Sequence, residues 1–171
     1  MRDAFRGTER LCRSRPGAIG RGMRRLALAL CQILVALPAA ARDPDRLSFL
    51  IASRHVDARS AFQEVNPGVI LTWEGRPGLS LAGYYNSYGR LSVAAAVTWP
   101  VFERGELQVD LFAGGAWYPR DGRRFAAHLG DVVPIGGVQA RWRNAFVQVI
   151  PSDGVETDAI VGFGVTFEVP R

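Results

Sequence analysis

The sequence predicts an all-β protein: an eight-stranded antiparallel up-and-down β-barrel that follows a cleaved signal peptide. Short runs in which apolar residues alternate with small or polar ones recur along the chain, as in half-buried strands. Turn-forming Gly, Asp and Ser residues separate these runs at nearly even spacing. The N-terminal segment also has the pattern of a secretory signal. A chain of 171 residues has room for one domain of ordinary size.

The signal segment is predicted from three consecutive features. Residues 23–25 carry two arginines, an apolar stretch follows over 26–37, and small residues then precede residue 42. This order is typical of a signal peptide, and the apolar stretch is short for a membrane-spanning helix. We expect a leader over 1–41 and a barrel domain over 42–171. Within the leader, Met23 is expected to be the true translation start. The alternative is a cytoplasmic chain with an apolar N-terminal helix.

Charge and cysteine content limit what the barrel domain can do. The chain has no lysine, and eight of its arginines lie in the leader, so residues 42–171 hold 13 Arg against 14 Asp and Glu. This balance argues against a nucleic-acid partner. The only cysteines, Cys12 and Cys31, also lie in the leader. The barrel domain therefore has no disulfide, no thiolate metal site and no cysteine nucleophile.

The eight strands are predicted where the alternation is clearest and turn residues bound it. The predicted ranges are 46–56, 65–74, 79–88, 90–101, 106–118, 132–141, 143–151 and 158–168. Strands of about ten residues in this number fit a small closed barrel. The polar stretch over 119–131 is the longest interval between strands and predicts the longest loop.

The alternation leaves two orientations open. In 107–117 and 158–168, one face is continuously apolar and the other is small or polar. A soluble barrel would turn the large apolar face inward, whereas an outer-membrane barrel would turn it toward lipid. The signal peptide favours the membrane barrel. So do aromatic residues near predicted strand ends, where interfacial girdles lie: Trp73, Trp99, Trp117, Tyr118 and Trp142. Outer-membrane barrels commonly end on an aromatic residue, whereas here four non-aromatic residues follow Phe167. A soluble periplasmic barrel therefore remains an alternative.

A histidine and a serine are predicted to meet at one rim. His55 ends the first predicted strand, and Asn86 and Ser87 end the third, so both ends lie on the same side of an antiparallel barrel. An imidazole there could take the Ser87 proton during attack on an acyl carbonyl. An ordinary turn and a surface histidine would give the same sequence. Because His128 is the only other histidine and no phosphate-binding loop occurs, we predict neither a metal nor a cofactor.

Several short motifs occur in the same order as in a known family. In chain order they are His55, Phe62 to Gly68, Leu81 to Tyr88, Ser92 to Pro100, Leu111 to Gly115, Val133 to Val138, and Val147 to Pro151. Together they cover about residues 50–168, and the chain resembles the lipid A palmitoyltransferases, the PagP family of outer-membrane acyltransferases. Each motif is short, so their order carries the resemblance.

The resemblance implies a function and a set of site residues. The chain would move a fatty acyl group from a phospholipid to lipid A or a related lipid, as a monomer in the outer membrane, without a cofactor. His55 and Ser87 match the family's His and Ser, whereas Asn86 replaces its Asp and the family's N-terminal amphipathic helix is absent. Tyr85, which alternation places on the face of Ser87, would contact substrate. So would the segment in which Pro134 is expected to mark a gap in the barrel wall, with Gly136 and Gly137 leaving room beside it.

Two other functions stay open from the residues. The chain could be a non-catalytic barrel that binds a lipid, or a structural envelope protein, located in the periplasm or secreted. Small secreted PagP-like proteins of unassigned function share the same outline. The Asn86 replacement and the missing helix motivate these alternatives.

Overall fold

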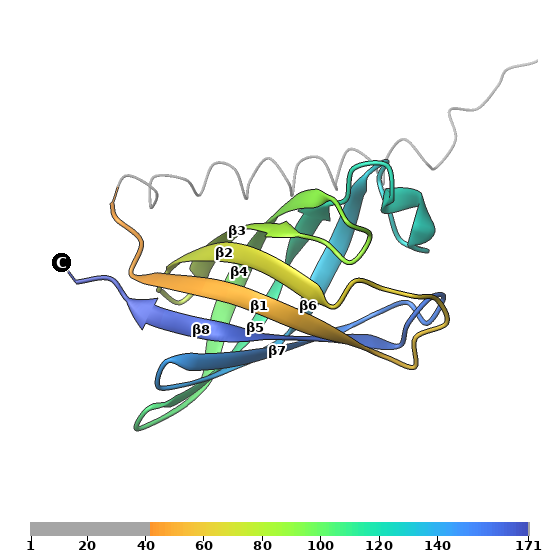
Figure 1. Ribbon diagram of the computed structural model, residues 1–171. Coiled ribbons are helices and arrows are strands. Elements are labelled where there is room, and N and C mark those ends of the chain that lie inside the picture. The colour runs from red at the N-terminus through yellow and green to blue at the C-terminus, as the bar shows by residue number, and fades with distance from the viewer. Residues whose placement is uncertain (1–41, 171) are drawn as a thin grey trace, which may run out of the picture. The chain divides into compact units, whose positions relative to one another are not determined.

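The computed structural model describes residues 42–170, and the predicted leader and start site lie outside this range. All extended elements of the described range join one closed antiparallel barrel, with neighbours in sequence paired and the last strand paired to the first (Figure 1). The predicted fold class is therefore confirmed. The strands are β1 (Arg46–Val56), β2 (Val65–Trp73), β3 (Gly78–Tyr85), β4 (Leu91–Arg104), β5 (Leu107–Trp117), β6 (Val132–Trp142), β7 (Ala145–Pro151) and β8 (Ala159–Glu168).

The largest difference from the predicted strands lies between β3 and β4. The third strand was expected to run to residue 88, but β3 ends at Tyr85 because the backbone turns at Asn86. The fourth continues to Arg104, beyond the predicted residue 101, and its register shifts between Pro100 and Phe102. Such a bulge accommodates a proline, which has no ladder donor.

The two rims of the barrel differ in the length of their connections. One rim, here called the loop rim, carries the segments 57–64, 86–90, 118–131 and 152–158. The opposite turn rim carries the shorter connections 74–77, 105–106 and 143–144, together with the start of β1 and the end of β8. A short 3-10 helix, η2 (Gly122–Arg124), lies in the segment 118–131, which is the longest loop of the described range, as the sequence predicted. No helix within residues 42–170 is long and apolar enough to cross a membrane.

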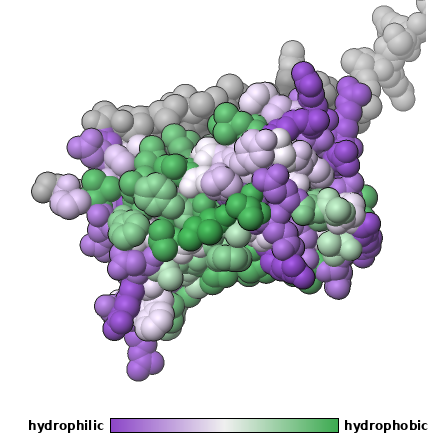
Figure 2. Space-filling view, in the orientation of Figure 1, coloured by the Kyte–Doolittle hydropathy of each residue, from purple (hydrophilic) through white to green (hydrophobic). Residues whose placement is uncertain are grey.

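Large apolar side chains lie on the outer surface of the barrel. Figure 2 shows hydrophobic residues across the middle of one face and hydrophilic residues at its two ends. Exposed examples come from all around the wall: Phe49, Val69, Val93, Leu111, Val138 and Phe163. The buried residues, by contrast, include many polar ones, such as Ser48, Thr72, Ser92 and Thr166. Of the two predicted orientations, the structure has the one with the apolar face outward.

The aromatic residues near strand ends divide into two groups. Trp99, Trp117 and Trp142 are exposed on the outer wall, as a girdle requires. Trp73 is only 7% exposed, and its indole N–H donates a hydrogen bond to the Arg42 carbonyl over 2.9 Å. Tyr118 lies just past β5 and lines a cavity in the barrel. The girdle prediction is therefore wrong for Trp73 and Tyr118, because a strand-end position alone does not fix which face a side chain takes.

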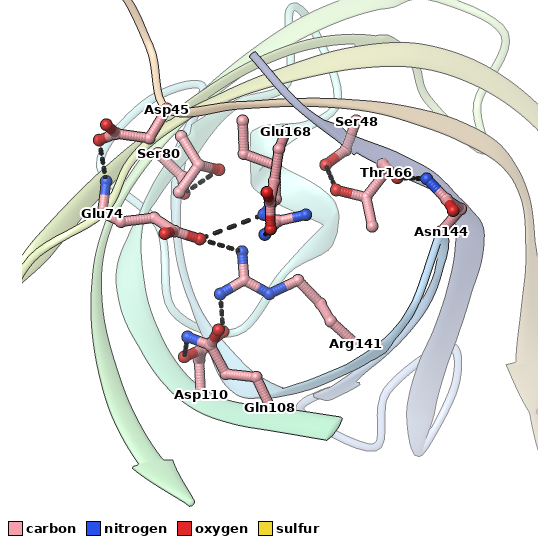
Figure 3. A network of polar contacts seen from close by, with 12 residues as sticks. Asp45, Ser48, Glu74, Ser80, Gln108, Asp110, Arg141, Asn144, Thr166 and Glu168 are labelled. Atoms are coloured by element: carbon pink, nitrogen blue, oxygen red, sulfur yellow. Dashed lines mark hydrogen bonds and ion pairs between the residues drawn. The ribbon is translucent and has the colours of Figure 1, made fainter. Parts of the chain in front are cut away.

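A chain of ion pairs crosses the lumen near the turn rim (Figure 3). Arg141 contacts Asp110 at 3.0 Å and Glu74 at 3.2 Å, and both side chains of the Arg141–Asp110 pair are almost fully buried. Glu74 also contacts Arg46, which in turn contacts Glu168 at 3.1 Å. These residues come from β1, β5, β6 and β8 and from the turn after β2. The ionic chain, defined by these five residues, therefore places charged groups across the lumen at this end.

We predict that Arg141→Met lowers the free energy of unfolding by about 3–5 kcal/mol, because it leaves the buried Asp110 carboxylate without its cation. The double change Asp110→Asn with Arg141→Met should recover most of that loss, since no buried charge then stays unpaired. Urea unfolding in detergent micelles measures both. Equal stabilities of the single and double variants would contradict the role given to the pair.

Candidate functional site

His55 and Ser87 line one small cavity at the loop rim, here called the rim cavity. His55 is near the end of β1, and Ser87 lies in the turn after β3, so β2 separates their strands as the sequence predicted. No hydrogen bond joins the two side chains within the described residues. The structure therefore brings the predicted pair to one cavity, but without a hydrogen bond between the two described side chains.

The imidazole of His55 is held by stacking and not by a hydrogen bond. Its ring lies parallel to that of Phe62, with centroids 4.0 Å apart and an interplanar angle of 10°. The residue is 7% exposed, and its Nδ1 atom is buried without a hydrogen-bond partner in the described part of the chain. Among these residues, no carboxylate or amide therefore fixes the orientation of this ring.

Asn86 builds the turn between β3 and β4. Its side-chain oxygen accepts hydrogen bonds from the backbone N–H groups of Tyr88 at 2.9 Å and Arg90 at 3.1 Å. Its amide nitrogen donates to the Ser92 hydroxyl at 2.8 Å, and the residue is 1% exposed. These bonds are those of an Asx turn, which Asn forms readily. The amide is thus engaged away from His55, which it was predicted to orient.

Tyr84 takes the place that alternation gave to Tyr85. Tyr85 is 40% exposed on the outer wall, whereas Tyr84 lines the large cavity inside the barrel. The alternation rule placed Tyr85 with Ser87, but β3 ends at Tyr85, and the period of two does not extend into the turn. The structure therefore corrects this position by one residue.

Aromatic rings continue from His55 across the mouth of the barrel. Phe62 contacts Tyr88 edge-to-face, Tyr88 contacts Tyr118, and the rings of Tyr118 and Phe125 have centroids 5.0 Å apart. These rings come from the loop-rim segments 57–64, 86–90 and 118–131, so they pack the loops against one another. Edge-to-face pairs of this kind stabilise the fold by more than the burial of their apolar area alone.

Charged groups tie the same loops together. Glu156 accepts a hydrogen bond from the Tyr88 hydroxyl at 2.9 Å and contacts Arg124 at 3.3 Å. Asp121 is buried and pairs with both Arg124 and Arg90. Burial, together with the bond to Glu156, raises the pKa of the Tyr88 phenol well above its usual range, so this group stays neutral.

A second, larger cavity fills the barrel below the mouth, and we call it the lumenal cavity. It is lined mainly by apolar side chains, among them Ile70, Ala94, Phe112, Ile135 and Ile150. Ser87, Tyr118, Phe125 and Ile160 line this cavity and the rim cavity as well. The two spaces are therefore neighbours that share these residues as a partition.

The wall between β6 and β7 is paired over only part of its height. The ladder ends toward the loop rim at Val138 and Val149, so β6 residues 132–137 pair with β5 but not with β7. Pro134 is exposed within this seam and is also one of the residues that line the lumenal cavity. The gap expected at Pro134 is present as a gap on the β7 side.

The two glycines predicted beside the gap differ in position. A Cβ on Gly137 would lie 2.1 Å from the carbonyl oxygen of Val149, so only glycine fits where the ladder ends. A Cβ on Gly136 would lie 3.3 Å from the Phe112 carbonyl oxygen. The close approach of β6 and β7 thus requires glycine at position 137, whereas Gly136 lies one residue farther into the seam.

A second unpaired stretch, between β2 and β3, is sealed. The ladder there starts at Gly68 and Tyr84, leaving residues 65–67 without partners on β3. The Asn66 amide donates to the Tyr85 carbonyl at 3.1 Å, and its oxygen accepts from the Ser53 hydroxyl at 2.6 Å. A side chain thus closes this part of the wall, whereas no side chain bridges the seam between β6 and β7 in the described structure.

Sequence reasoning missed the residues that the folded loops bring together. Glu156 and Phe125 lie in loops whose conformation has no periodic signal, so their places near His55 could not be read from the chain. Gln139 and Gln148 were detectable, because alternation places both on the lumenal face. Within residues 42–170, no group of three or more His, Asp or Glu side chains is arranged to hold a metal ion.

We predict that Asn86→Ala lowers the free energy of unfolding by about 2 kcal/mol, because it removes the acceptor of two backbone N–H groups and the partner of Ser92. Asn86→Asp should stay near wild type, since a carboxylate can accept the same bonds and the Ser92 hydroxyl can donate in turn. Urea unfolding of the two variants measures this, and an unchanged midpoint for Asn86→Ala would show that the turn does not depend on this amide.

Comparison with known proteins assigns no family to this chain. No protein-family model matches the chain, and no curated protein matches it.

Proposed function

We propose that this protein is an outer-membrane acyltransferase of the kind that the PagP resemblance implies. It takes a fatty acyl group from a phospholipid and transfers it to lipid A or a related lipid. One observation carries the proposal: the predicted His55 and Ser87 share a cavity that adjoins a mainly apolar lumenal cavity, beside which the wall lacks ladder pairs between β6 and β7.

The surface of the barrel supports the membrane location. Its outer wall carries exposed Phe, Leu and Val side chains, and three exposed tryptophans lie among them. Removing such a surface from water is favourable by about 25 cal/mol per Å² of apolar area. Short turns at one rim and longer loops at the other also match the usual form of outer-membrane barrels.

The proposed reaction needs one proton acceptor at the rim. The acyl chain lies in the lumenal cavity, with its ester carbonyl at the partition near Ser87. The acceptor hydroxyl attacks the carbonyl carbon, its proton passes to His55, and the bond to the glycerol oxygen breaks. The imidazolium then returns the proton to that glycerol oxygen, which leaves a lysophospholipid and a new ester. Ser87 either positions the carbonyl or carries the acyl group transiently.

A second candidate function is a barrel that binds a lipid without catalysis. It is favoured by the Asn86 geometry, because the amide is engaged in a turn and His55 has no orienting partner among the described residues. Under this reading, the lumenal cavity still holds an acyl chain, but no ester is formed. The two functions differ in what happens to lipid A.

We predict that His55→Ala lowers the rate of acyl transfer about a hundredfold or more, because no base remains to take the acceptor proton. Mass spectrometry of lipid A from cells that express wild type or variant measures the product directly. Ser87→Ala, tested beside it, should lower the rate as well.

His128→Ala is the matched control, since His128 is exposed in the longest loop and lines neither cavity. It should transfer at the wild-type rate. If the wild type leaves lipid A unchanged while the purified barrel still binds fatty acids, the non-catalytic function is correct. Transfer by His55→Ala at the wild-type rate would remove His55 from the mechanism.

We predict that Pro134→Ala keeps the fold and slows acyl transfer, because the restored N–H can help to pair β6 with β7 and narrow the seam. The rate is measured in detergent with a defined phospholipid donor. Pro100→Ala serves as the control, since Pro100 lies at the β4 bulge away from the seam. Equal transfer rates for Pro134→Ala and wild type would show that Pro134 shapes the sheet but has no role in acyl transfer.

A further inference from the structure

A line of mostly polar residues crosses the inner wall of the lumenal cavity. It consists of five polar residues and one glycine that line the cavity, and it is here called the polar stripe: Asp110, Gln139, Gln148, Gly162, Ser53 and Asn66. Most of the remaining lining is apolar, and its polar exceptions are Ser80 and Thr98 on β3 and β4 and several residues of the loop rim.

Strand pairing holds the polar stripe together. Asp110 is the register partner of Gln139, Gln139 of Gln148, and Gln148 of Gly162. Gly162 is in turn the partner of Ser53, whose hydroxyl donates to Asn66 at 2.6 Å. The stripe therefore follows the hydrogen-bonding direction of the barrel from the ionic chain near the turn rim up to β2.

The middle of the polar stripe has unused hydrogen-bonding groups. Asp110 is bonded to Gln108 and paired with Arg141, and the ends at Ser53 and Asn66 are bonded to each other. Gln139 and Gln148, in contrast, have no hydrogen-bond partner within the described residues. Two neighbouring amides thus offer four N–H donors and two carbonyl acceptors to whatever fills the cavity.

Gly162 leaves room for the Gln148 side chain. A Cβ at this position would lie 2.9 Å from the Gln148 side-chain nitrogen, so any larger residue would press against the amide. The seam in the wall begins directly above, because Val138 and Val149 form the last pair of the β6–β7 ladder. The two glutamines therefore lie one ladder pair below the end of the seam.

A plain hydrocarbon chain fits this wall poorly. Packing methylene groups against the two amides would exclude water and leave their donors and acceptors unpaired, and each such group costs about 1–3 kcal/mol when fully buried. A site built to bond a hydroxyl rejects the analogue that lacks it for this reason. The ligand that fits is an elongated apolar chain with a hydroxyl group at the depth of the glutamines.

We propose that the lumenal cavity selects a hydroxylated fatty acyl chain, whose hydroxyl is bound by the Gln139 and Gln148 amides. This inference rests on the proposed function in one respect, that the lumen holds an acyl chain, and it names the class of chain. Gln139 and Gln148 are then specificity-determining residues that act apart from His55 and Ser87.

The test compares matched ligands on the purified wild-type barrel. Hexadecanoic acid and hydroxyhexadecanoic acids, with the hydroxyl at successive positions from the carboxyl end to the distal end, displace a fluorescent fatty acid. A detergent with a steroid body, in place of a linear tail, keeps the lumen free. We expect one hydroxylated isomer to bind about tenfold more tightly than hexadecanoic acid, which is the gain from one to two hydrogen bonds.

Variants assign the preference to the glutamines. Gln139→Leu with Gln148→Leu should lose the preference and bind hexadecanoic acid more tightly, since the wall becomes apolar. Gln63→Leu makes the same chemical change in the segment 57–64, outside both cavities, and should keep the wild-type preference.

The wild-type comparison needs no variant, so it decides the proposal even if the double variant fails to fold. Equal affinity for all isomers would overturn it, and so would a preference that survives in the double variant or an absence of any fatty-acid binding. Acyl transfer is measured separately on lipid A. Binding with the preference but without transfer upholds this proposal and rejects the enzyme, whereas transfer without the preference does the reverse.

Discussion

The closed ladder of hydrogen bonds is the constraint on which the rest of the structure depends. Because β8 pairs with β1, the sheet has no free edge, and its backbone groups are satisfied within the wall over most of its height. Closure also divides the side chains strictly into two sets, one outside and one in a lumen that eight strands keep narrow. The large apolar residues are outside, so the lumen is left with small, polar and a few bulky side chains.

The two ends of the lumen carry different side-chain chemistry, and this sets what the space between them can hold. At the turn rim, the ionic chain from Asp110 through Arg141 to Glu74 places charge across the floor. At the loop rim, the rings of Tyr118 and Phe125 cover the cavity, and Asp121 and Glu156 hold their loops. A ligand in the lumen therefore meets an aromatic ceiling, a polar floor and one polar side.

How far the sequence predicts this structure depends on whether a residue lies in a strand or a loop. Alternation in 107–117 and 158–168 predicted strands that match β5 and β8 within one residue at each end, because period two follows directly from a pleated backbone. The same rule failed at Tyr85, where the strand ends in a turn. It placed His55 and Ser87 at one rim, since that needs only antiparallel order. The bonds of Asn86 and the convergence of four loops depend on contacts distant in sequence, which no local pattern records.

The seam between β6 and β7 is best understood by contrast with the sealed stretch between β2 and β3. Both stretches lack ladder pairs near the loop rim, and both carry a proline on the outer face. At β2, the Asn66 side chain donates to the Tyr85 carbonyl and so replaces a missing backbone bond. At β6, the corresponding lumenal positions are Val133, Ile135 and Gly137, which have no side-chain donor to offer. An unpaired backbone group in lipid is costly, and Pro134 reduces that cost by supplying no N–H. A side chain therefore closes the gap at β2, and none closes the gap at β6. A barrel that admits a ligand through its wall needs one such gap left unclosed.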